Sequence, residues 1–555
     1  MTAARLRARV GGAVPLFLLV LLLVHGLPLL GSGVILDNTR QYGPPLVAAR
    51  AGDAWLAAQP QIHYFHDASP RLYRALVGGL AAWIPVVAAT KAYALLLLLP
   101  LAAIARGLGR MLWRDPVRAA GFAVLLLANA VFSNQMLTGT PRDLGTVLFL
   151  GLLLALLQRR FVAVLAALVP LVGIYPTFGL LALGTLWLAL LPELRQPPRS
   201  WAPLLLSLPA AALGLKLLGP GLAAAAWGPT LRLFGQPALG SMAELSRRNA
   251  EADGRGPSVA RSLGVVPSPA HLLALLRDKR FRFLPAPGEH AFGWLGAPLT
   301  ILVVVALLAA LTALVHRLQD RGTGLPAPLP FSLPWRPAWP QRVLLALGLA
   351  ALLLYLLSFA LAFRLHNPNR YGMMPAVLLL SGVEMAGLGL LLGQRRGAWL
   401  LPWLLALALP LLRAPVDPLP LPADALAAVA APLRAPGSQL LVVENGERAG
   451  AIANALPLTH GVRVFYAEEM DRGFQLRAIQ DGQELRAHRR ALAEAVQRRD
   501  PALAAELARL RISHLLGAET ELAPLAARPA CLVPIPEQLA LLPADCLAPS
   551  PEPRR

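Results

Sequence analysis

Apolar runs long enough to cross a lipid bilayer recur along the first three quarters of this 555-residue chain. A helix of about 17–25 mostly apolar residues spans the roughly 30 Å hydrocarbon core. The runs are continuously apolar, whereas the strands of a membrane barrel alternate between apolar and polar residues. The sequence therefore predicts an α-helical polytopic membrane protein with about eleven transmembrane helices. We expect them at residues 13–35, 86–105, 117–136, 141–157, 161–175, 177–192, 201–219, 296–315, 343–363, 373–392 and 397–413.

The composition agrees with a membrane protein and argues against nucleic-acid binding. Hydrophobic residues make up 56% of the chain and charged residues only 15%, whereas soluble proteins have about 25% charged residues. The net charge of +21 comes mostly from arginines scattered between the apolar runs. Because they form no basic helix or aromatic-interleaved patch, we expect them to contact anionic lipid head groups instead.

The positions of the arginines predict how the chain is oriented. With eleven spans, each set of arginines in a short loop falls on the same side of the membrane, which the positive-inside rule assigns to the cytoplasm. The N-terminus then lies in the cytoplasm, and the first apolar run is an uncleaved span because it is too long for a signal peptide. The segments predicted to be extracytoplasmic are the first loop 36–85, the second large loop 220–295 and the tail 414–555.

The predicted external segments have secondary structure of their own. In the first loop, residues 42–58 follow a helical period typical of a helix in the membrane interface, and a second helix is expected over 70–84. We divide the chain into a transmembrane domain, 1–413, and a small C-terminal extracytoplasmic α/β domain, 414–555. The tail has strand-like runs at 438–443, 461–466 and 512–516 and helical periodicity over 485–510. It also holds the two cysteines, Cys531 and Cys546, which form either a disulfide or two buried thiols.

Asp37 follows the first span directly and opens the first loop. A carboxylate at the mouth of a span is placed to act as a general base on an acceptor, or to hold a divalent cation, Mg²⁺ or Mn²⁺, against a phosphate. The simpler interpretation is that Asp37 caps the following helix. Its neighbour is Asn38, which belongs to the same loop but cannot serve as a second carboxylate.

His63, His66 and Asp67 bring two imidazoles and a carboxylate close together in the same loop. Histidines three residues apart bind one metal only on a helix and with a third ligand. Pro60 and Pro70 bracket the segment and predict an irregular loop instead. We therefore assign no metal site here and keep the three residues as part of a candidate site loop.

Two arginines lie in short loops on the predicted external side. Arg142 follows a Thr-Gly-Thr-Pro turn, and Arg370 precedes Tyr371 at the start of a span. Because a guanidinium suits phosphate and these loops are otherwise poor in arginine, both positions predict an anionic ligand. The alternatives are a snorkelling arginine in an ordinary turn and an interfacial Arg–Tyr anchor.

Glu384 falls in the middle of a predicted span. A carboxylate in hydrocarbon is costly and is usually paired or functional. We favour a structural pair, with Lys91, Lys216 or His25 as its partner.

Short motifs along the membrane region resemble the GT-C superfamily of polytopic membrane glycosyltransferases, and more closely an uncharacterised bacterial subgroup related to it. The matching stretches are residues 36–41, 67–73, 139–142, 175–176 and 368–371. The resemblance implies that Asp37 is the catalytic carboxylate and that Arg370 faces a lipid phosphate. Many members carry a second acidic residue where this chain has Asn38, which weakens the expectation of a metal.

The resemblance implies an inverting transferase that moves a sugar from a polyprenyl-phosphate donor to a glycan, lipid or protein acceptor of the cell envelope. Such an enzyme would work on the external face of the bacterial inner membrane, among membrane lipids. Asn38 leaves open a non-catalytic component of envelope polysaccharide assembly or export. A lipid or solute transporter is disfavoured, because the chain has few mid-span charges and no detectable repeat.

Overall fold

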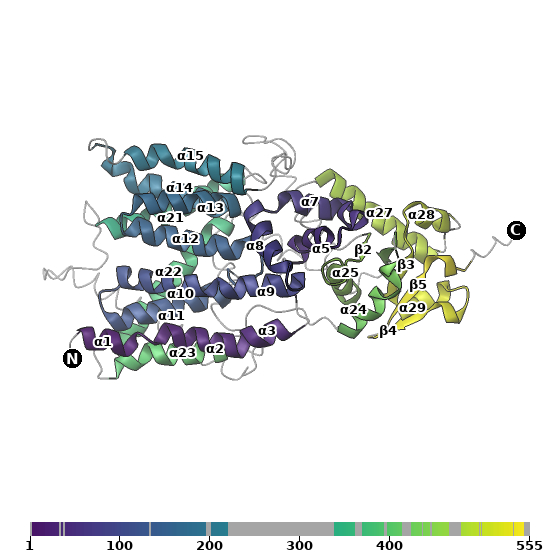
Figure 1. Cartoon of the computed structure of the whole chain (residues 1–555), viewed down its shortest axis with the longest axis horizontal. Helices are drawn as coiled ribbons and strands as arrows, with labels where there is room; N and C mark the ends of the chain where they lie inside the picture. Colours follow the sequence, from purple (N-terminus) through teal and green to yellow (C-terminus); the bar gives the residue numbers. More distant parts are fainter. Residues whose placement is uncertain are drawn as a thin grey trace, which may run out of the picture. The chain divides into compact units, whose positions relative to one another are not determined.

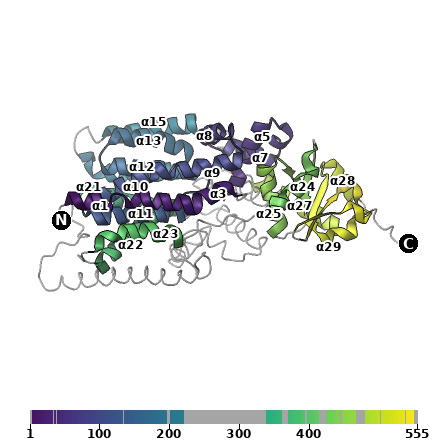
Figure 2. The same ribbon diagram turned by 60° about the horizontal axis from the view of Figure 1, so that its bottom comes forward.

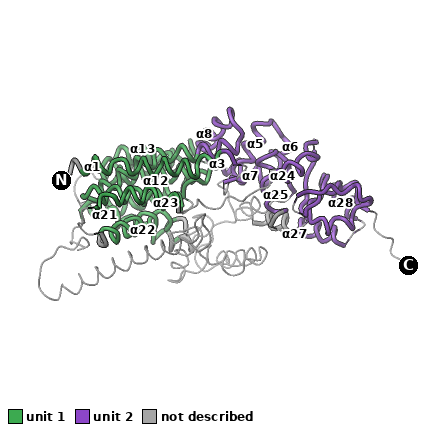
Figure 3. The backbone as a smooth tube through the Cα atoms, turned by 90° about the horizontal axis from the view of Figure 1, so that it is seen from below, with its two compact units in different colours: residues 1–30, 94–219, 230–417 green, residues 31–93, 220–229, 418–555 purple. Residues whose placement is uncertain are grey.

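The computed structural model describes most of the chain as two compact units, which Figure 3 colours separately. The described residues are 3–32, 35–36, 39–132, 135–195, 201–219, 338–360, 369–392, 397–412, 423–435, 437–443, 447–465, 479–498, 500, 502–536 and 538–548. Unit 1 comprises residues 1–30, 94–219 and 230–417, and unit 2 comprises residues 31–93, 220–229 and 418–555. Unit 2 therefore combines the first loop with the tail, whereas the sequence division placed the loop in the transmembrane domain 1–413.

Unit 1 is built from helices that run side by side (Figures 1 and 2). Its described helices are α1 (Ala3–Val10), α2 (Ala13–Leu21), η1 (Leu22–Gly26), α3 (Leu27–Gly31), α10 (Leu98–Leu112), α11 (Pro116–Phe132), α12 (Pro141–Leu157), α13 (Phe161–Ile174), α14 (Pro176–Leu190), η2 (Leu191–Arg195), α15 (Trp201–Leu218), α21 (Trp339–Ala360), α22 (Asn369–Leu392), η6 (Ala398–Leu400) and α23 (Leu401–Leu412). Most of α9 (Val86–Leu96) belongs to unit 2, which includes residues 31–93. Every predicted span within the described residues contains such a helix, and the predicted span 296–315 lies outside them.

Five helices of the described chain are long and apolar enough to cross a membrane. They are Ala8–Gly31, Val86–Leu112, Pro176–Leu194, Trp201–Leu218 and Tyr371–Gly389. The predicted polytopic α-helical membrane architecture is thereby supported.

Helix α15 shows how these helices pack with their large apolar side chains outward. It buries small residues such as Ala211 and Gly214, while Leu205 keeps 66% of its surface exposed. A Cβ at Gly214 would overlap the carbonyl oxygen of Val169 in α13, so the two helices approach backbone to backbone. Small residues at the helix contact and leucines outside are the pattern expected of helices packed in lipid.

The segment around Tyr175 and Pro176 forms a tight turn between two helices. Tyr175 ends α13 and Pro176 begins α14, where the missing N–H of proline costs no hydrogen bond. Gly179 of α14 lies directly against Val172 of α13, leaving no room for a side chain. The two predicted spans are therefore separate helices and not one broken helix.

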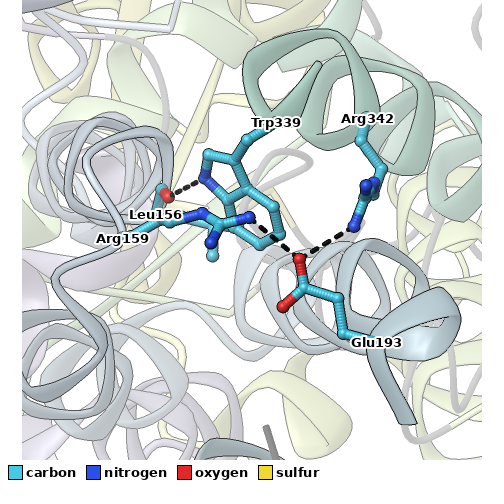
Figure 4. A network of polar contacts seen from close by, with 5 residues as sticks. All are labelled: Leu156, Arg159, Glu193, Trp339 and Arg342. Atoms are coloured by element: carbon cyan, nitrogen blue, oxygen red, sulfur yellow. Dashed lines mark hydrogen bonds and ion pairs between the residues drawn. The ribbon is translucent and has the colours of Figure 1, made fainter. Parts of the chain in front are cut away.

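A polar cluster fastens one end of α12 to η2 and α21 (Figure 4). Oε1 of Glu193 accepts hydrogen bonds from Nη2 of Arg159 and Nη1 of Arg342, both at 2.9 Å. The Trp339 indole donates to the Leu156 carbonyl at 2.8 Å, and the Arg159 guanidinium lies 4.4 Å from the Trp339 ring centroid. This cluster of Leu156, Arg159, Glu193, Trp339 and Arg342 joins elements that are almost 200 residues apart.

The described part of the tail in unit 2 is organised around a mixed sheet with the strand order β2-β1-β3-β5-β4. Strand β1 pairs in parallel with β2 and β3, whereas β5 pairs antiparallel with β3 and β4. The strands are β1 (Gln439–Val442), β2 (Arg463–Val464), β3 (His514–Ala518), β4 (Val533–Ile535) and β5 (Leu539–Pro543). Strands β1 and β2 lie within the predicted segments 438–443 and 461–466, and β3 overlaps the predicted segment 512–516 but ends two residues later. Cys531 and Cys546, on either side of β4 and β5, form a disulfide.

Helices cover both faces of this sheet. Leu441 and Val443 pack with α27 and α28 in one core, and the alternating residues Leu440 and Val442 are buried on the other face. Helix α25 contacts β1 and β2, and α24 contacts β4. The tail helices are α24 (Ala423–Ala430), η7 (Pro432–Arg434), α25 (Glu447–Thr459), α27 (Ile479–Arg498), α28 (Leu503–Arg509), α29 (Glu519–Leu522), η8 (Ala523–Leu525), η9 (Pro529–Cys531) and η10 (Ala544–Cys546).

The first loop folds into short helices, where the sequence predicted one helix over 42–58. They are α4 (Thr39–Tyr42), α5 (Pro44–Ala51), α6 (Ala54–Ala57), α7 (Pro60–Ala68) and α8 (Arg71–Ala81). Gly52 ends α5 in the left-handed region at φ 64°, and Asp53 then caps α6 by accepting from the Leu56 N–H. The predicted irregular loop between Pro60 and Pro70 was wrong, because Pro60 occupies the first turn of α7.

The first loop docks on the tail within unit 2. Trp55 donates to the Ser438 carbonyl at 3.4 Å, and Gln59 donates to the carbonyl of Val464 in β2. A Cβ at Gly43 would overlap Leu458 of α25, so the backbone of the loop touches that helix. These contacts between residues about 400 positions apart make the loop and the tail one compact unit.

Candidate functional site

A groove of about 550 Å³ opens between α5 and α8 of the first loop. Pro45, Leu46 and the small residues of both helices form its apolar walls. Basic side chains surround these walls: Arg50, His66, Arg71 and Arg74. An apolar groove with a basic rim suits an amphiphile that carries negative charge.

A chain of hydrogen bonds fixes the side chains on one edge of the groove. Nη1 of Arg74 lies 2.6 Å from Nε2 of His66, and Nδ1 of His66 lies 3.1 Å from Oδ1 of Asp67. Because a guanidinium can only donate, Nε2 of His66 accepts and Nδ1–H donates to the carboxylate. His63 also approaches Asp67, with Nε2 3.8 Å from Oδ2.

This hydrogen-bond chain does not fit a divalent cation at His63, His66 and Asp67. Both ring nitrogens of His66 are occupied, and the group nearest to Nε2 is the positive guanidinium of Arg74. In the described part of the chain, no three His, Cys, Asp or Glu side chains are grouped to hold a metal.

Among the groove residues, Arg74 is the strongest candidate to bind an anion. Burial lowers the pKa of its guanidinium by removing water, Asp67 opposes this shift, and Arg71 adds to it. Its Nε is buried and has no hydrogen-bond partner among the described residues. Arg50, Arg71 and Arg74 were not predicted as site residues, although the spacing of Arg71 and Arg74 on an amphipathic helix is a usable signal.

In unit 1, the turn that carries Arg142 is held by the buried carboxylate of Asp143. Its oxygens accept from the Thr138 N–H at 3.1 Å, the Thr138 hydroxyl at 2.7 Å and the Gly139 N–H at 2.8 Å. The Thr140 side chain caps α12 by accepting from the Arg142 N–H. Asp143 thus shapes the turn, and half-buried Arg142 lies in the first turn of the helix.

The same turn lies beside the first residues of α22. The Gln135 amide contacts Sδ of Met373 at 3.9 Å, and the Thr146 hydroxyl donates to the Gln135 carbonyl at 3.1 Å. Helices α12 and α22 both begin at this end of unit 1. The structure therefore brings together the two chain segments that contain Arg142 and Arg370.

Asp37, Asn38, Arg370 and Tyr371 are the remaining residues of the predicted site. Asp37 and Asn38 lie outside the described residues. Arg370 is in the first turn of α22, and only its backbone is described. The adjacent Tyr371 is buried in unit 1, with 1% of its surface exposed.

Glu384 is hydrogen-bonded to Asn129, which is not among the three partners predicted from sequence. Its Oε2 accepts from the Asn129 amide at 2.8 Å, and the same amide donates to the Ser381 hydroxyl at 3.0 Å. Lys91 donates instead to the Ser32 carbonyl at 2.6 Å, and His25 contacts the Pro410 carbonyl at 2.6 Å. The contact between Glu384 and Asn129 joins α22 to α11 inside the bundle, which is a structural arrangement.

Comparison with known proteins identifies a solved structure but no family. No family model matches the chain, and no curated protein matches it. The chain is similar to the crystal structure of ArnT from Cupriavidus metallidurans in the apo state, with 15% identity and a TM-score of 0.41 over 97% of this chain and 99% of that one. The activity must therefore be inferred from the residues of the chain itself.

Proposed function

We propose that this chain is a membrane glycosyltransferase that moves a sugar from a polyprenyl-phosphate donor to an acceptor of the cell envelope. The proposal rests on the motifs that resemble GT-C enzymes and on the character of the first loop. The observation that carries it is the groove between α5 and α8, which combines apolar walls with Arg50, Arg71 and Arg74. Polyprenyl phosphates and lipid-linked acceptors share the amphiphilic, anionic character that such a groove accommodates.

In the proposed reaction, an oxygen of the acceptor attacks the anomeric carbon of the donor sugar. The bond from that carbon to the phosphate oxygen breaks, and polyprenyl phosphate leaves with the electron pair. Asp37 takes the proton from the acceptor hydroxyl. One displacement inverts the configuration at the anomeric carbon.

The developing phosphate charge requires fixed positive groups. We assign this role to Arg370 with Arg142, whose chain segments meet at one end of unit 1. The Asp143 carboxylate holds the turn before Arg142, which reduces the reorganisation needed when charge develops. Tyr371 then supports the first turn of α22 from its buried position.

The test uses the full-length chain in liposomes with a panel of radiolabelled polyprenyl-phosphate sugars and an envelope extract as the acceptor source. We expect sugar transfer by the unmodified chain and none above background by Asp37→Asn. Asp115→Asn, which changes an exposed aspartate elsewhere, is the matched control and is expected to retain transfer. Unchanged transfer by Asp37→Asn would exclude the proposed general base.

A binding measurement separates the transferase from a non-catalytic envelope component, the alternative that Asn38 leaves open. A component that has lost catalysis but kept the scaffold would bind the labelled donor and transfer nothing. For the transferase we expect Arg370→Ala to weaken donor binding and transfer together. Binding of the donor without transfer to any fraction of the extract would favour the non-catalytic component.

A further inference from the structure

A hollow of about 320 Å³ lies in unit 1 and is separate from the groove between α5 and α8. It is lined by residues before and at the start of α2, by the end of α10 and by the start of α11. Three arginines line it, Arg106, Arg110 and Arg114, together with Trp113. The hollow therefore combines three positive charges with an aromatic ring.

Close helix packing and small side chains create the space. A Cβ at Gly109 would overlap the Ala119 carbonyl, so α10 and α11 touch backbone to backbone. Gly11 and Ala120 line the hollow and fill little of it. The chain leaves α10 in an extended conformation at Trp113, with φ −123°.

The helical geometry gathers the three arginines. Arg106 and Arg110 are four residues apart on α10 and so lie on one face, one turn from each other. Arg114 follows the end of the helix and lines the same hollow. None of the described residues that line it is a carboxylate, and the next acid along the chain, Asp115, faces Arg118 at 3.9 Å.

In the part of the chain that the structure describes, no hydrogen bond or ion pair engages any of these three arginines. An arginine that only snorkels toward water needs no enclosed volume beside it. Three of them around one hollow with apolar walls indicate a ligand that carries both a phosphate and an apolar part.

The position of the hollow along the spans identifies the source of that phosphate. The span Ala8–Gly31 begins beside the hollow, and the span Val86–Leu112 ends beside it. The hollow is therefore level with the lipid head groups at one membrane surface. We propose that it binds the phosphate head group of an anionic phospholipid, with Arg106, Arg110 and Arg114 around the phosphate and Val10 and Val14 beside the start of the acyl chains.

Native mass spectrometry of the full-length chain in detergent micelles tests this proposal. The probes are phosphatidylglycerol, phosphatidylcholine with the same acyl chains, and inorganic phosphate. A basic side chain near an anionic head group strengthens binding by about fivefold, so losing two weakens it by about thirtyfold. We expect one phosphatidylglycerol to remain bound to the unmodified chain and to be lost in the double variant Arg106→Gln, Arg110→Gln.

Two further variants keep the result interpretable. Ala120→Leu fills the hollow but keeps every charge, and is also expected to lose the lipid. Arg160→Gln removes an exposed arginine from another loop and is expected to keep it. The proposal would be overturned if the unmodified chain kept phosphatidylcholine as well as it keeps phosphatidylglycerol. It would also be overturned if Ala120→Leu and the double variant, both folded, still bound phosphatidylglycerol. Displacement of phosphatidylglycerol by inorganic phosphate would assign the hollow to a soluble phosphate compound and overturn the lipid assignment.

Discussion

The guanidinium of Arg463 in β2 lies 4.0 Å from the ring centroid of Trp55 in the first loop. The same arginine donates to the Trp55 carbonyl at 3.1 Å, and Arg511 lies 5.1 Å from the ring. Burial lowers the pKa of Arg463, Arg511 adds to this shift, and Asp53 opposes it. A single tryptophan thus holds two arginines of the tail against the first loop, whose groove we assign to an anionic amphiphile.

Replacing Trp55 by Leu is expected to loosen the first loop from the tail. A cation–π contact contributes about 0.5–2 kcal/mol, depending on how far it is removed from water. Hydrogen exchange of the full-length chain, followed by mass spectrometry, is expected to show faster exchange in residues 44–59 and 456–465. Trp83→Leu is the matched control, because Trp83 has 88% of its surface exposed. Equal exchange in both variants would contradict the docking role of Trp55.

The cluster around Glu193 makes a prediction about unit 1. Glu193→Gln removes the charge that two arginines share, and charge-assisted hydrogen bonds contribute about 1.5–3 kcal/mol each. We expect a lower thermal unfolding midpoint of the protein in detergent. Glu494→Gln breaks an exposed pair with Arg498 and is expected to cost less than about 0.5 kcal/mol. The prediction fails if the two variants unfold at the same temperature.

Local patterns predict the membrane helices well and the contacts between distant segments poorly. A span is visible in sequence because about twenty successive apolar residues satisfy a bilayer by themselves. In contrast, Glu384 bonds to Asn129, and Trp55 to Arg463, through partners hundreds of positions away. Nothing in the local sequence around any of these residues identifies its partner.

The errors in the first loop and the tail have local physical reasons. Pro60 was interpreted as a loop signal, although proline is favoured in the first turn of a helix. Strand β5 was missed because Leu-Ala-Leu-Leu-Pro contains no β-branched residue. The groove arginines were missed because Arg71 and Arg74 gain significance only when α5 packs beside α8.

The pH dependence of the tail follows from His514 in β3. Burial lowers the pKa of this imidazole below its usual 6.5, against a smaller opposing effect of Asp545. Between the folded and unfolded pKa values the unfolded chain binds more protons, so stability falls as the pH drops below about 6.5. Hydrogen exchange in β3, corrected for the intrinsic effect of pH, is expected to accelerate at pH values below this range. His514→Gln is expected to remove most of this dependence.

Glu506 provides an internal reference for that measurement. A hydrogen bond from Arg509, with a further contribution from His488, lowers the pKa of its carboxyl to about 2. Its stabilising effect is therefore fully present above pH 4.5 and is lost only as the pH falls toward 2. A change in β3 that begins near neutral pH therefore comes from a histidine and not from the Glu506 carboxyl. Because burial also lowers the pKa of His460, the His514→Gln variant identifies which histidine is responsible. A β3 response that begins only below pH 4.5 would contradict the assignment to His514.

The disulfide between Cys531 and Cys546 is expected to stabilise the edge of the sheet. It closes a loop with a sequence separation of 15, for which chain entropy predicts about 3 kcal/mol. The double variant Cys531→Ser, Cys546→Ser is expected to increase hydrogen exchange in β4 and β5 more than in β1. Equal exchange in the variant and the unmodified chain would show that this edge is held by its packing alone.

Asp143 gives the last prediction, since its carboxylate shapes the turn before Arg142. It accepts two backbone N–H bonds and one hydroxyl bond in a fully buried position. In Asp143→Asn the amide oxygen can still accept, but the amide NH₂ would meet one of these donors. One unsatisfied buried donor costs about 1–3 kcal/mol, so we expect a lower unfolding midpoint in detergent. Asp115→Asn, at an exposed position, is expected to leave the midpoint unchanged. If Asp143→Asn unfolds at the same temperature as Asp115→Asn, the carboxylate does not hold the turn. Any loss of sugar transfer in Asp143→Asn would then point to a direct role of the carboxylate in the reaction.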